Sequence, residues 1–269
     1  MRADRGPQLS WSGQTDVGRV RRNNEDSFLG LAIEAQDVRL LGKVGDSGNL
    51  DADYVFAVSD GMGGAMAGEF ASRIAIEKIT RMLPPTFKQN AAGIREGFED
   101  VLTELFAEIH RALVYLGACY EECEGMGATL SLCWFRPHCM YFGHVGDSRI
   151  YYLPAGGETR QLTHDDTHVG WLFRNGQLNE REAKSHPRRN VLQKALGAGH
   201  QFVEPQIGAV GIETGDRFLL CTDGVTDAVY DAQLCELITG EDAPAASLVR
   251  HSVALSGRDN ATAVVVEVR

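Results

Sequence analysis

Five acidic positions in this sequence lie at the ends of short apolar runs. Each run is rich in β-branched or aromatic residues, as strands are. Asp60 follows residues 54–59, Asp147 follows 140–145, Asp223 follows 217–222, Asp259 precedes 261–268, and Glu25-Asp26 precedes 27–33. Any one of these aspartates is most simply a turn residue, because Asp and Gly tolerate the backbone conformations of turns. If the strand ends converge, however, the carboxylates share one small volume, and bound cations must relieve their repulsion.

The ligand chemistry of such a cluster restricts the metal. Carboxylates without an accompanying His or Cys cluster favour Mg²⁺ or Mn²⁺ over zinc. Two such ions held close together form a hydrolytic centre in which a bridging hydroxide attacks phosphorus in line. Arg21 lies just ahead of Glu25 and Asp26, and a guanidinium there would bind two phosphate oxygens. The plainer interpretation of the basic residues 19–22 is a solvated run on an acidic protein.

Charge and composition limit the partners. The formal net charge of −11 argues against nucleic acid or an anionic membrane, since both bind clustered Lys and Arg. Residues 1–12 are polar, and the apolar runs are too short to span a bilayer. We therefore expect a soluble, cytoplasmic, monomeric protein. The six cysteines are too sparse for a disulfide scaffold and are expected to be buried free thiols.

The remaining elements follow from hydrophobic periodicity. Apolar residues recur at helical spacing over residues 65–83, ended by Pro84-Pro85, and again over residues 94–116. Weaker helical patterns cover residues 231–238 and 244–256. The order of strands, two helices, strands, two helices and a strand predicts an α+β fold with sheets inside and helices outside. The polar segment 164–199 is expected to be a flap, within a single domain of residues 1–269.

Six motifs occur in order along the chain: Arg21-x-x-Asn24-Glu25-Asp26, Asp60-Gly61-Met62-Gly63-Gly64, Gly-Met-Gly-Ala-Thr-Leu at 125–130, Gly-Asp-Ser-Arg at 146–149, Thr222-Asp223-Gly224 and Asp259-Asn260. Together they resemble the motifs of the metal-dependent serine/threonine protein phosphatases, the type 2C or PPM family, in its bacterial branch. The resemblance covers residues 10–269. It implies a four-layer α-β-β-α sandwich, in which helices flank two central antiparallel β-sheets.

The resemblance also implies a role for each matching residue, with Arg21 and Asp60 as the catalytic ones. Two Mn²⁺ or Mg²⁺ ions are expected, with a third, weaker ion beside the flap. The resemblance implies that Asp60 bridges both ions, that the Gly61 carbonyl is a ligand of one ion, and that Asp223 and Asp259 bind the second. Glu25 and Asp26 would contact the ions through water. Asp147 would bind the third ion, and Arg21 would bind the substrate phosphate.

The sequence departs from the family pattern at three positions. Met62 and Ala65 stand where relatives carry a histidine that could donate a proton to the leaving group. We therefore expect a metal-bound or ordered water to donate that proton. Asp166 stands where relatives usually have His, and this additional carboxylate is expected to alter the affinity for the third ion. The flanking His164 and His168 are expected to be surface residues.

These observations favour a phosphatase that removes phosphate from phosphoserine and phosphothreonine and so opposes Ser/Thr kinases. Its expected partners are phosphorylated proteins, together with kinases or phosphopeptide-binding proteins. One alternative is a dedicated phosphatase for a single signalling phosphoprotein, such as an anti-sigma antagonist. The other is an inactive phosphoprotein-binding module, which the presence of Arg21 and the four principal aspartates disfavours.

Overall fold

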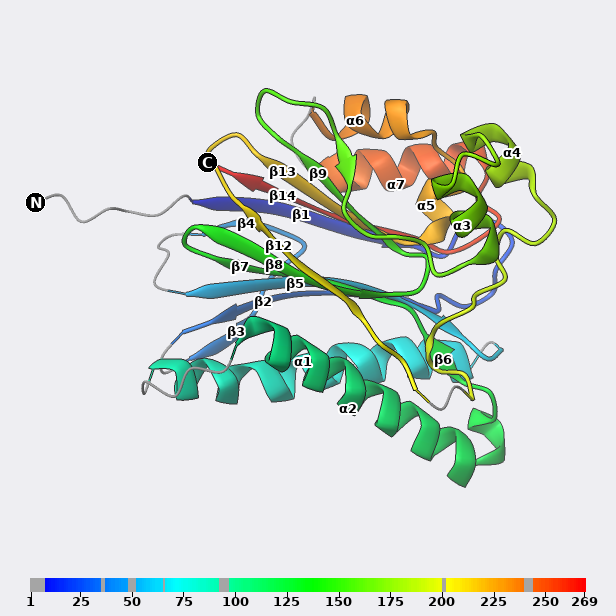
Figure 1. The fold of residues 1–269 in the computed structure, drawn as a ribbon, viewed down its shortest axis with the longest axis horizontal. Coiled ribbons are helices and arrows are strands. Elements are labelled where there is room, and N and C mark those ends of the chain that lie inside the picture. The colour runs from blue at the N-terminus through cyan, green and yellow to red at the C-terminus, as the bar shows by residue number, and fades with distance from the viewer. Residues whose placement is uncertain are drawn as a thin grey trace, which may run out of the picture.

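Two antiparallel sheets stack face to face at the centre of the molecule, and helices cover the outer face of each (Figure 1). The computed structural model describes residues 8–34, 37–47, 52–64, 66–91, 97–199, 202–239 and 244–269, without the side chains of 84–91. Within these residues every strand pairing is antiparallel. The predicted α-β-β-α layering is therefore confirmed.

Both sheets draw strands from distant parts of the chain. Within the described residues, one sheet has the order β10-β9-β13-β14-β1-β4, and the other has the order β11-β6-β5-β7-β8-β12, with β2 paired to β5 and β3 paired to β2. The strands of the first sheet are β1 (Leu9–Asp16), β4 (Val44–Asp46), β9 (Arg149–Leu153), β10 (Arg160–Gln161), β13 (Arg217–Cys221) and β14 (Ala261–Val268). Those of the second are β2 (Asp26–Ile33), β3 (Val38–Leu40), β5 (Asp53–Met62), β6 (Gly127–Ala128), β7 (Leu130–Arg136), β8 (Cys139–Val145), β11 (Leu196–Gly197) and β12 (Gln206–Gly211).

Apolar side chains fill each of the three spaces between layers. Phe56, Phe135 and Phe218 meet between the two sheets, which is why the apolar runs of the central strands are nearly continuous rather than alternating. A second cluster lies between the sheet of β5 and helices α1 (Ala67–Ala91) and α2 (Phe98–Cys119). A third lies between the sheet of β13 and helices α6 (Asp231–Thr239) and α7 (Pro244–Leu255).

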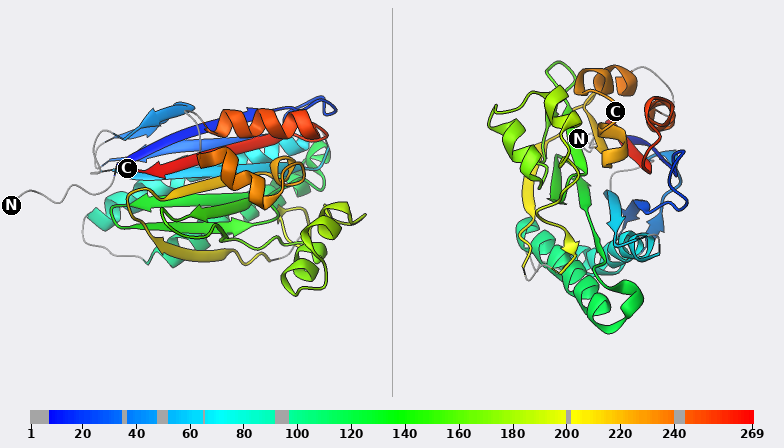
Figure 2. Two further views of the ribbon diagram at one scale, coloured as in Figure 1. Left: turned by 90° about the horizontal axis from the view of Figure 1, so that it is seen from above. Right: turned by 90° about the vertical axis from the view of Figure 1, so that its right-hand side faces the viewer.

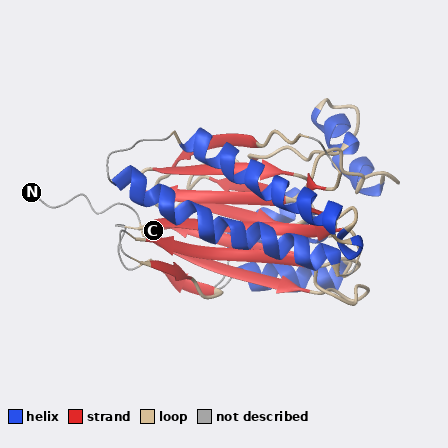
Figure 3. Cartoon of the chain, turned by 90° about the horizontal axis from the view of Figure 1, so that it is seen from below, coloured by secondary structure: helices blue, strands red, loops and turns tan. Residues whose placement is uncertain are grey.

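Helices α1 and α2 lie side by side across the outer face of the second sheet (Figure 3). α1 is buried along a stripe of small and branched residues, including Ala71, Ala75 and Ile79. The prediction that Pro84-Pro85 ends this helix is wrong, because α1 continues to Ala91. Packing of the preceding stripe on the sheet outweighs the two missing backbone donors. The predicted start of the second helix near residue 94 lies outside the described residues.

The predicted flap segment carries two short helices, α3 (His168–Arg174) and α4 (Glu180–Ser185). Figure 2 shows them at one end of the sandwich, beside the strand ends rather than over a sheet face. The short helix α5 (Asp223–Thr226) lies at the same end (Figure 1). Among the described residues, no helix has the length and apolar character needed to cross a bilayer.

Candidate active site

Strand register brings the first two aspartates together. β2 and β5 are antiparallel neighbours in which Asp26 lies directly opposite Asp60. Carboxylates in directly opposite positions share a face of the sheet and repel each other. Thr222, which directly follows β13 of the other sheet, donates its Oγ1 hydroxyl to Asp26 Oδ2 at 2.8 Å. Both sheets therefore contribute to the same small volume.

The backbone beside Asp60 packs too closely for larger residues. A Cβ at Gly61 would lie 1.9 Å from the carbonyl oxygen of Gly68, in the first turn of α1. A Cβ at Gly68 would lie 2.9 Å from Gly61 O and 3.0 Å from Glu25 Oε2. The Glu25 carboxylate and the Gly61 carbonyl oxygen therefore lie on the same side of this helix turn, next to Asp60.

Asp223 and Asp259 reach the same end from the first sheet. β13 ends at Cys221 and β14 begins at Ala261, and the two strands are antiparallel neighbours. A Cβ at Gly224 would lie 1.9 Å from the carbonyl oxygen of Asn260. The turn after Asp223 therefore packs directly against the residue that follows Asp259, which explains the Asp-Gly sequence there.

Asn260 holds the loop before β2 against this end of the sheet. It is 4% exposed. Its Oδ1 accepts a hydrogen bond from Glu25 N at 2.8 Å, and its Nδ2 donates to Val17 O at 2.9 Å and Asn23 O at 3.0 Å. These bonds fix the loop that carries Arg21, so this arginine is placed by the residue next to Asp259.

Arg21 lies at the rim of the acidic site. Its Nη2 donates to Asp259 Oδ2 at 2.8 Å, and its side chain is 48% exposed. One side of the guanidinium therefore contacts the acidic residues while the rest faces solvent. This geometry suits an anion that approaches the site from outside, because Arg presents several donors in one plane.

Burial and mutual repulsion disfavour ionisation of the cluster. Burial raises the pKa of Asp60 well above its usual range, and the charges of Asp26, Asp223, Asp147 and Asp259 raise it further. Burial followed by the charge of Asp147 also raises the pKa of Asp223 well above its usual range. The pKa of Asp26 is raised to about 7, chiefly by burial. The structure thus brings these five aspartates within electrostatic reach of one another, and bound cations would favour their ionised forms.

Two of these carboxylates have buried oxygens without a donor. Within the described part of the chain, Asp26 Oδ1 and Asp223 Oδ1 have no hydrogen-bond partner, although such atoms are costly unless a donor or a cation contacts them. The surrounding ligand set is oxygen only, which suits Mg²⁺ or Mn²⁺. Across the described residues, no three His, Cys, Asp or Glu side chains are arranged to hold one ion. Binding an ion here therefore also requires backbone oxygen, water or rotation of a carboxylate.

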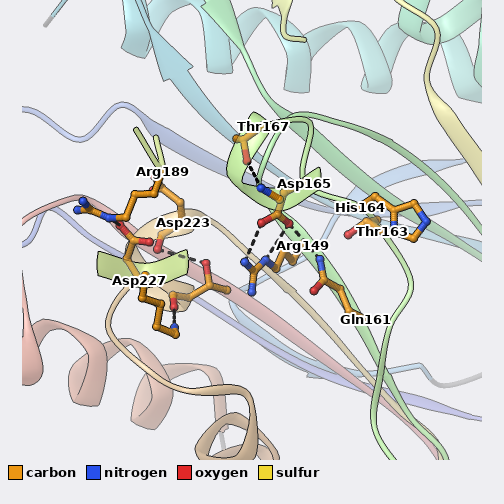
Figure 4. A network of polar contacts seen from close by, with 12 residues as sticks. Arg149, Gln161, Thr163, His164, Asp165, Thr167, Arg189, Asp223 and Asp227 are labelled. Atoms are coloured by element: carbon orange, nitrogen blue, oxygen red, sulfur yellow. Dashed lines mark hydrogen bonds and ion pairs between the residues drawn. The ribbon is translucent and has the colours of Figure 1, made fainter. Parts of the chain in front are cut away.

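Asp147 faces the flap. Together with Asp223 it lines a cleft whose other wall is formed by α3 and α4. Burial raises the pKa of Asp147 to about 7. Arg149, two residues further on, binds Asp165 at the base of the flap through Nε at 2.9 Å and Nη2 at 2.7 Å (Figure 4). This bidentate pair fixes one end of the flap beside the cleft.

A second set of contacts fixes the middle of the flap to α5. The side chain of Lys184 on α4, 15% exposed, donates to the carbonyl oxygen of Thr226 and, at 2.9 Å, to that of Val229. Arg189 Nε donates to Asp227 Oδ2 at 3.1 Å (Figure 4). Because α5 begins at Asp223, the flap is attached to the same short helix that carries a candidate metal ligand.

The positions where the sequence departs from the family pattern have different environments. Met62 is half-buried at the end of β5, and Ala65 lies outside the described residues. Asp166 Oδ2 accepts a hydrogen bond from Gly146 N at 3.0 Å. His164 and His168 are exposed, as expected. His168 stacks on Trp171.

The cysteine prediction is partly wrong. All six cysteines are free, but only Cys133 and Cys221 are buried, and Cys119 is exposed.

Several residues that shape the site were not assigned roles from sequence. Thr129 accepts from Asp60 N at 3.0 Å through Oγ1 and donates its own N–H to Asp60 O at 2.8 Å. Thr222 and Asn260 act as described above. Each of the three lies within or beside a recognised motif, which was a usable signal. For Asp227, the sequence signal was its position one helical turn after Asp223.

Comparison with known proteins agrees with this geometry. Residues 40–261 match the family profile described as Protein phosphatase 2C. The serine/threonine protein phosphatase PstP of Mycobacterium tuberculosis is 34% identical over 265 residues, which are 97% of this chain and 45% of PstP. This chain therefore spans less than half the length of that relative. The serine/threonine phosphatase stp of Listeria innocua is 32% identical over 258 residues, 94% of each protein.

A solved structure shows the same fold with metal bound. The crystal structure of the catalytic domain of PstP in complex with two manganese ions is 30% identical in sequence and aligns with a TM-score of 0.77, covering 97% of this chain and 99% of that one. The fold, the ordered motifs and the family match agree, and the chain belongs to the protein phosphatase 2C family.

Proposed function

We propose that this protein hydrolyses phosphoserine and phosphothreonine esters in proteins and so opposes Ser/Thr kinases. One observation carries the proposal: both sheets deliver aspartates to one end of the sandwich, where Asp26 and Asp223 have buried oxygens that receive no donor from the described residues, beside the exposed Arg21. The relatives named serine/threonine phosphatases in two bacterial genera support it.

The metal ligands are proposed from the positions of the carboxylates. Asp60 would contact two ions, with the Gly61 carbonyl on one of them and Asp223 and Asp259 on the other. Glu25 and Asp26 would act through water, and Asp147 would hold a third ion beside the flap. When bound, the ions supply a hydroxide nucleophile at neutral pH and positive charge beside the phosphate. The relative with two manganese ions supports Mn²⁺, and the oxygen-only ligand set suits Mg²⁺ equally.

Arg21 would bind the phosphate of the substrate. Its guanidinium now contacts Asp259 Oδ2, and a small rotation would direct its other donors toward two phosphate oxygens. Asp259 would then turn toward the metal site. Arg21 would hold the phosphorus in line between the attacking oxygen and the Ser or Thr oxygen that leaves.

The leaving alkoxide requires a proton when the phosphorus–oxygen bond breaks. Met62 has no proton to donate, and no side chain of suitable chemistry stands at residue 65. A water in the site would supply the proton, so the rate has no acidic limb that belongs to one histidine. A pH–rate profile with an acidic limb that disappears on replacing a single His would contradict this assignment.

The flap, residues 164–199, would contact the protein substrate around its phosphorylated residue, as part of a single domain. Its cleft opens beside Asp147 and Asp223. Phosphorylated proteins are the proposed substrates, and kinases or phosphopeptide-binding proteins are the proposed partners. The six free cysteines are typical of a reducing compartment, which supports a cytoplasmic location.

The test is metal-dependent turnover by the wild type and by Asp223→Asn. We expect Mn²⁺-dependent hydrolysis of para-nitrophenyl phosphate and of a phosphothreonine peptide by the wild type, and loss of about 100-fold or more in Asp223→Asn. Asp46→Asn, an exposed carboxylate at the other end of the first sheet, is the matched control. Absence of metal-dependent turnover in the wild type, with phosphopeptide binding retained, would identify a binding module instead. Turnover of one phosphoprotein alone would identify a dedicated phosphatase.

A further inference from the structure

The Gly146-Asp147 turn, which carries the carboxylate proposed for the third ion, is held by the first residues of the flap. Asp166 Oδ2 accepts from Gly146 N at 3.0 Å, and Asp166 N donates to Gly146 O at 2.7 Å. One residue of the flap thus satisfies both backbone groups of the residue before Asp147. The Asp166 side chain is 12% exposed, so solvent competes little for these bonds.

The opposite side of the turn is equally constrained. Gly146 has φ +113, and a Cβ there would lie 2.6 Å from Thr129 Cγ2, so the glycine is required. His144, which is fully buried, donates from Nε2 to Gly146 O at 3.0 Å, because a carbonyl oxygen can only accept. Gly146 is itself a buried residue, and the acceptor for its N–H is the Asp166 carboxylate. Removing that acceptor would leave a buried donor unpaired, which favours rearrangement of the turn.

Asp166 also closes the base of the flap. Its carbonyl oxygen accepts from Gln193 N at 2.7 Å, and Thr167 forms a bridge with Leu192. The second carboxylate oxygen, Oδ1, lies 3.9 Å from Lys194 Nζ. The same residue therefore joins the two ends of the flap and the turn that bears Asp147.

We propose that Asp166 is a positioning residue: its carboxylate orients the Gly146-Asp147 turn, and thereby the third-ion ligand, from the base of the flap. It acts as a hydrogen-bond acceptor for backbone and not as a ligand of the ion. This inference rests on the proposed role of Asp147 in the proposed function.

The test compares acceptor loss with charge loss. Asp166→Asn keeps an oxygen that can accept from Gly146 N–H but removes the charge, whereas Asp166→Ala removes both. Mn²⁺ binding would be followed by isothermal titration calorimetry and by the electron paramagnetic resonance signal of free Mn²⁺. We expect Asp166→Ala to weaken the weakest Mn²⁺ site about tenfold or more and to leave the tighter sites unchanged. Asp166→Asn should stay within about twofold of the wild type.

A second readout needs no metal. In the ¹⁵N-labelled, metal-free protein, the Gly146 amide should exchange with solvent much faster in Asp166→Ala than in the wild type or in Asp166→Asn. Lys194→Ala, which removes the neighbour of the other carboxylate oxygen, is the control and should change neither readout. If Asp166→Ala does not fold, Asp166→Ser gives the same comparison. The serine side chain is one bond shorter than aspartate, so its hydroxyl oxygen does not reach the N–H of Gly146.

Three results would overturn or redirect the proposal. Identical binding and exchange in Asp166→Ala and the wild type would exclude the positioning role. Equal weakening in Asp166→Asn and Asp166→Ala would show that the charge matters and that Asp166 contacts the ion. Asp147→Asn separates this inference from the proposed function. If Asp147→Asn keeps the weak Mn²⁺ site, Asp147 does not hold the third ion. If Asp147→Asn loses that site but Asp166→Ala keeps it, only the positioning role of Asp166 fails.

Discussion

Arg21 Nη2 lies 2.8 Å from Asp259 Oδ2, so the proposed phosphate ligand and a proposed metal ligand are paired with each other. This pair neutralises one charge of the acidic cluster before substrate or metal arrives. Because Asn260 fixes the loop of Arg21, the guanidinium can leave Asp259 without moving far. The ion pair with Asp259 therefore keeps the Arg21 guanidinium at the rim of the site, next to the position proposed for the phosphate.

Replacement of Arg21 tests this arrangement directly. Arg21→Ala should lower kcat/KM for para-nitrophenyl phosphate by about 10–100-fold, since a hydrogen bond to a charged group contributes about 1.5–3 kcal/mol. Arg21→Lys should recover only part of the activity, because an ammonium cannot bind two phosphate oxygens in one plane. Steady-state kinetics at saturating Mn²⁺ gives the comparison, with the neighbouring exposed Arg22→Ala as control. Equal losses of kcat/KM in Arg21→Ala and Arg22→Ala would show that general positive charge, not Arg21 in particular, is responsible.

The metal-free protein should lose stability as pH rises. Burial raises the pKa of Asp26 and of Asp147 to about 7, whereas an unfolded aspartate titrates near pH 4. Between about pH 4 and 7 the folded state therefore binds more protons than the unfolded state, and the free energy of unfolding falls as pH rises through this window. Added Mn²⁺ should raise the Tm more at pH 7 than at pH 5, because it binds the ionised carboxylates.

Thermal unfolding in a chelating buffer measures this effect. Asp26→Asn should flatten the pH dependence between about pH 4 and 7 and raise the Tm of the metal-free protein at pH 7. The exposed Asp46→Asn should leave the profile unchanged. A metal-free wild type whose Tm is constant or rises across this window would contradict the assignment of buried, repelling carboxylates.

The layers of the fold were predictable because their signals are local. The run 261–268 matches β14 at both ends, since a central strand buried on both faces is continuously apolar. The end of α1 was not predictable, because the two prolines are local stop signals that tertiary packing overrides. β1 was missed for a related reason: Leu9–Asp16 mixes polar and apolar residues, and its place is set by its pairing with β14.

The site followed from sequence only as far as its motifs extend. Asp60 and Asp223 were predictable because each follows an apolar strand and precedes glycine. The contact between Arg21 and Asp259 joins residues at opposite ends of the chain, and its distance depends on the fold. The role of Asp166 was open for the same reason: the sequence shows an additional carboxylate, but only the structure shows that it binds the backbone of Gly146.

The glycine after Asp60 should be intolerant of any side chain. In Gly61→Ala the new Cβ would lie 1.9 Å from Gly68 O, so β5 and α1 must separate. We expect a loss of about 3 kcal/mol or more in the free energy of unfolding of the metal-free protein. Gly156→Ala is the matched control, because nothing lies within 4 Å of its Cβ, and its effect should be within about 0.5 kcal/mol. Denaturant unfolding of both variants would show the difference, and similar stabilities would mean that the two backbones can separate freely.

Attachment of the flap to α5 should depend on Lys184. Its ammonium donates to the carbonyl oxygens of Thr226 and Val229 and lies 5.0 Å from the ring centroid of Tyr230. Lys184→Met keeps the apolar stem but leaves both carbonyl oxygens without this donor, at a cost of about 1–3 kcal/mol. We expect faster amide hydrogen exchange in residues 180–185, and a higher KM for a phosphothreonine peptide with little change for para-nitrophenyl phosphate, which has no peptide chain to contact the flap.

Lys78→Met is the control for loss of a lysine from a helix. Lys78 lies on α1, far from the flap in sequence, and its ammonium is 3.8 Å from Glu108, a partly exposed pair that contributes little. It should change neither hydrogen exchange in α4 nor the KM for the peptide. If Lys184→Met left exchange in residues 180–185 at the wild-type rate, other contacts, such as Arg149-Asp165 and Arg189-Asp227, would be enough to hold the flap. If both substrates lost activity equally, Lys184 would support α5 and Asp223 rather than the contact between the flap and its substrate.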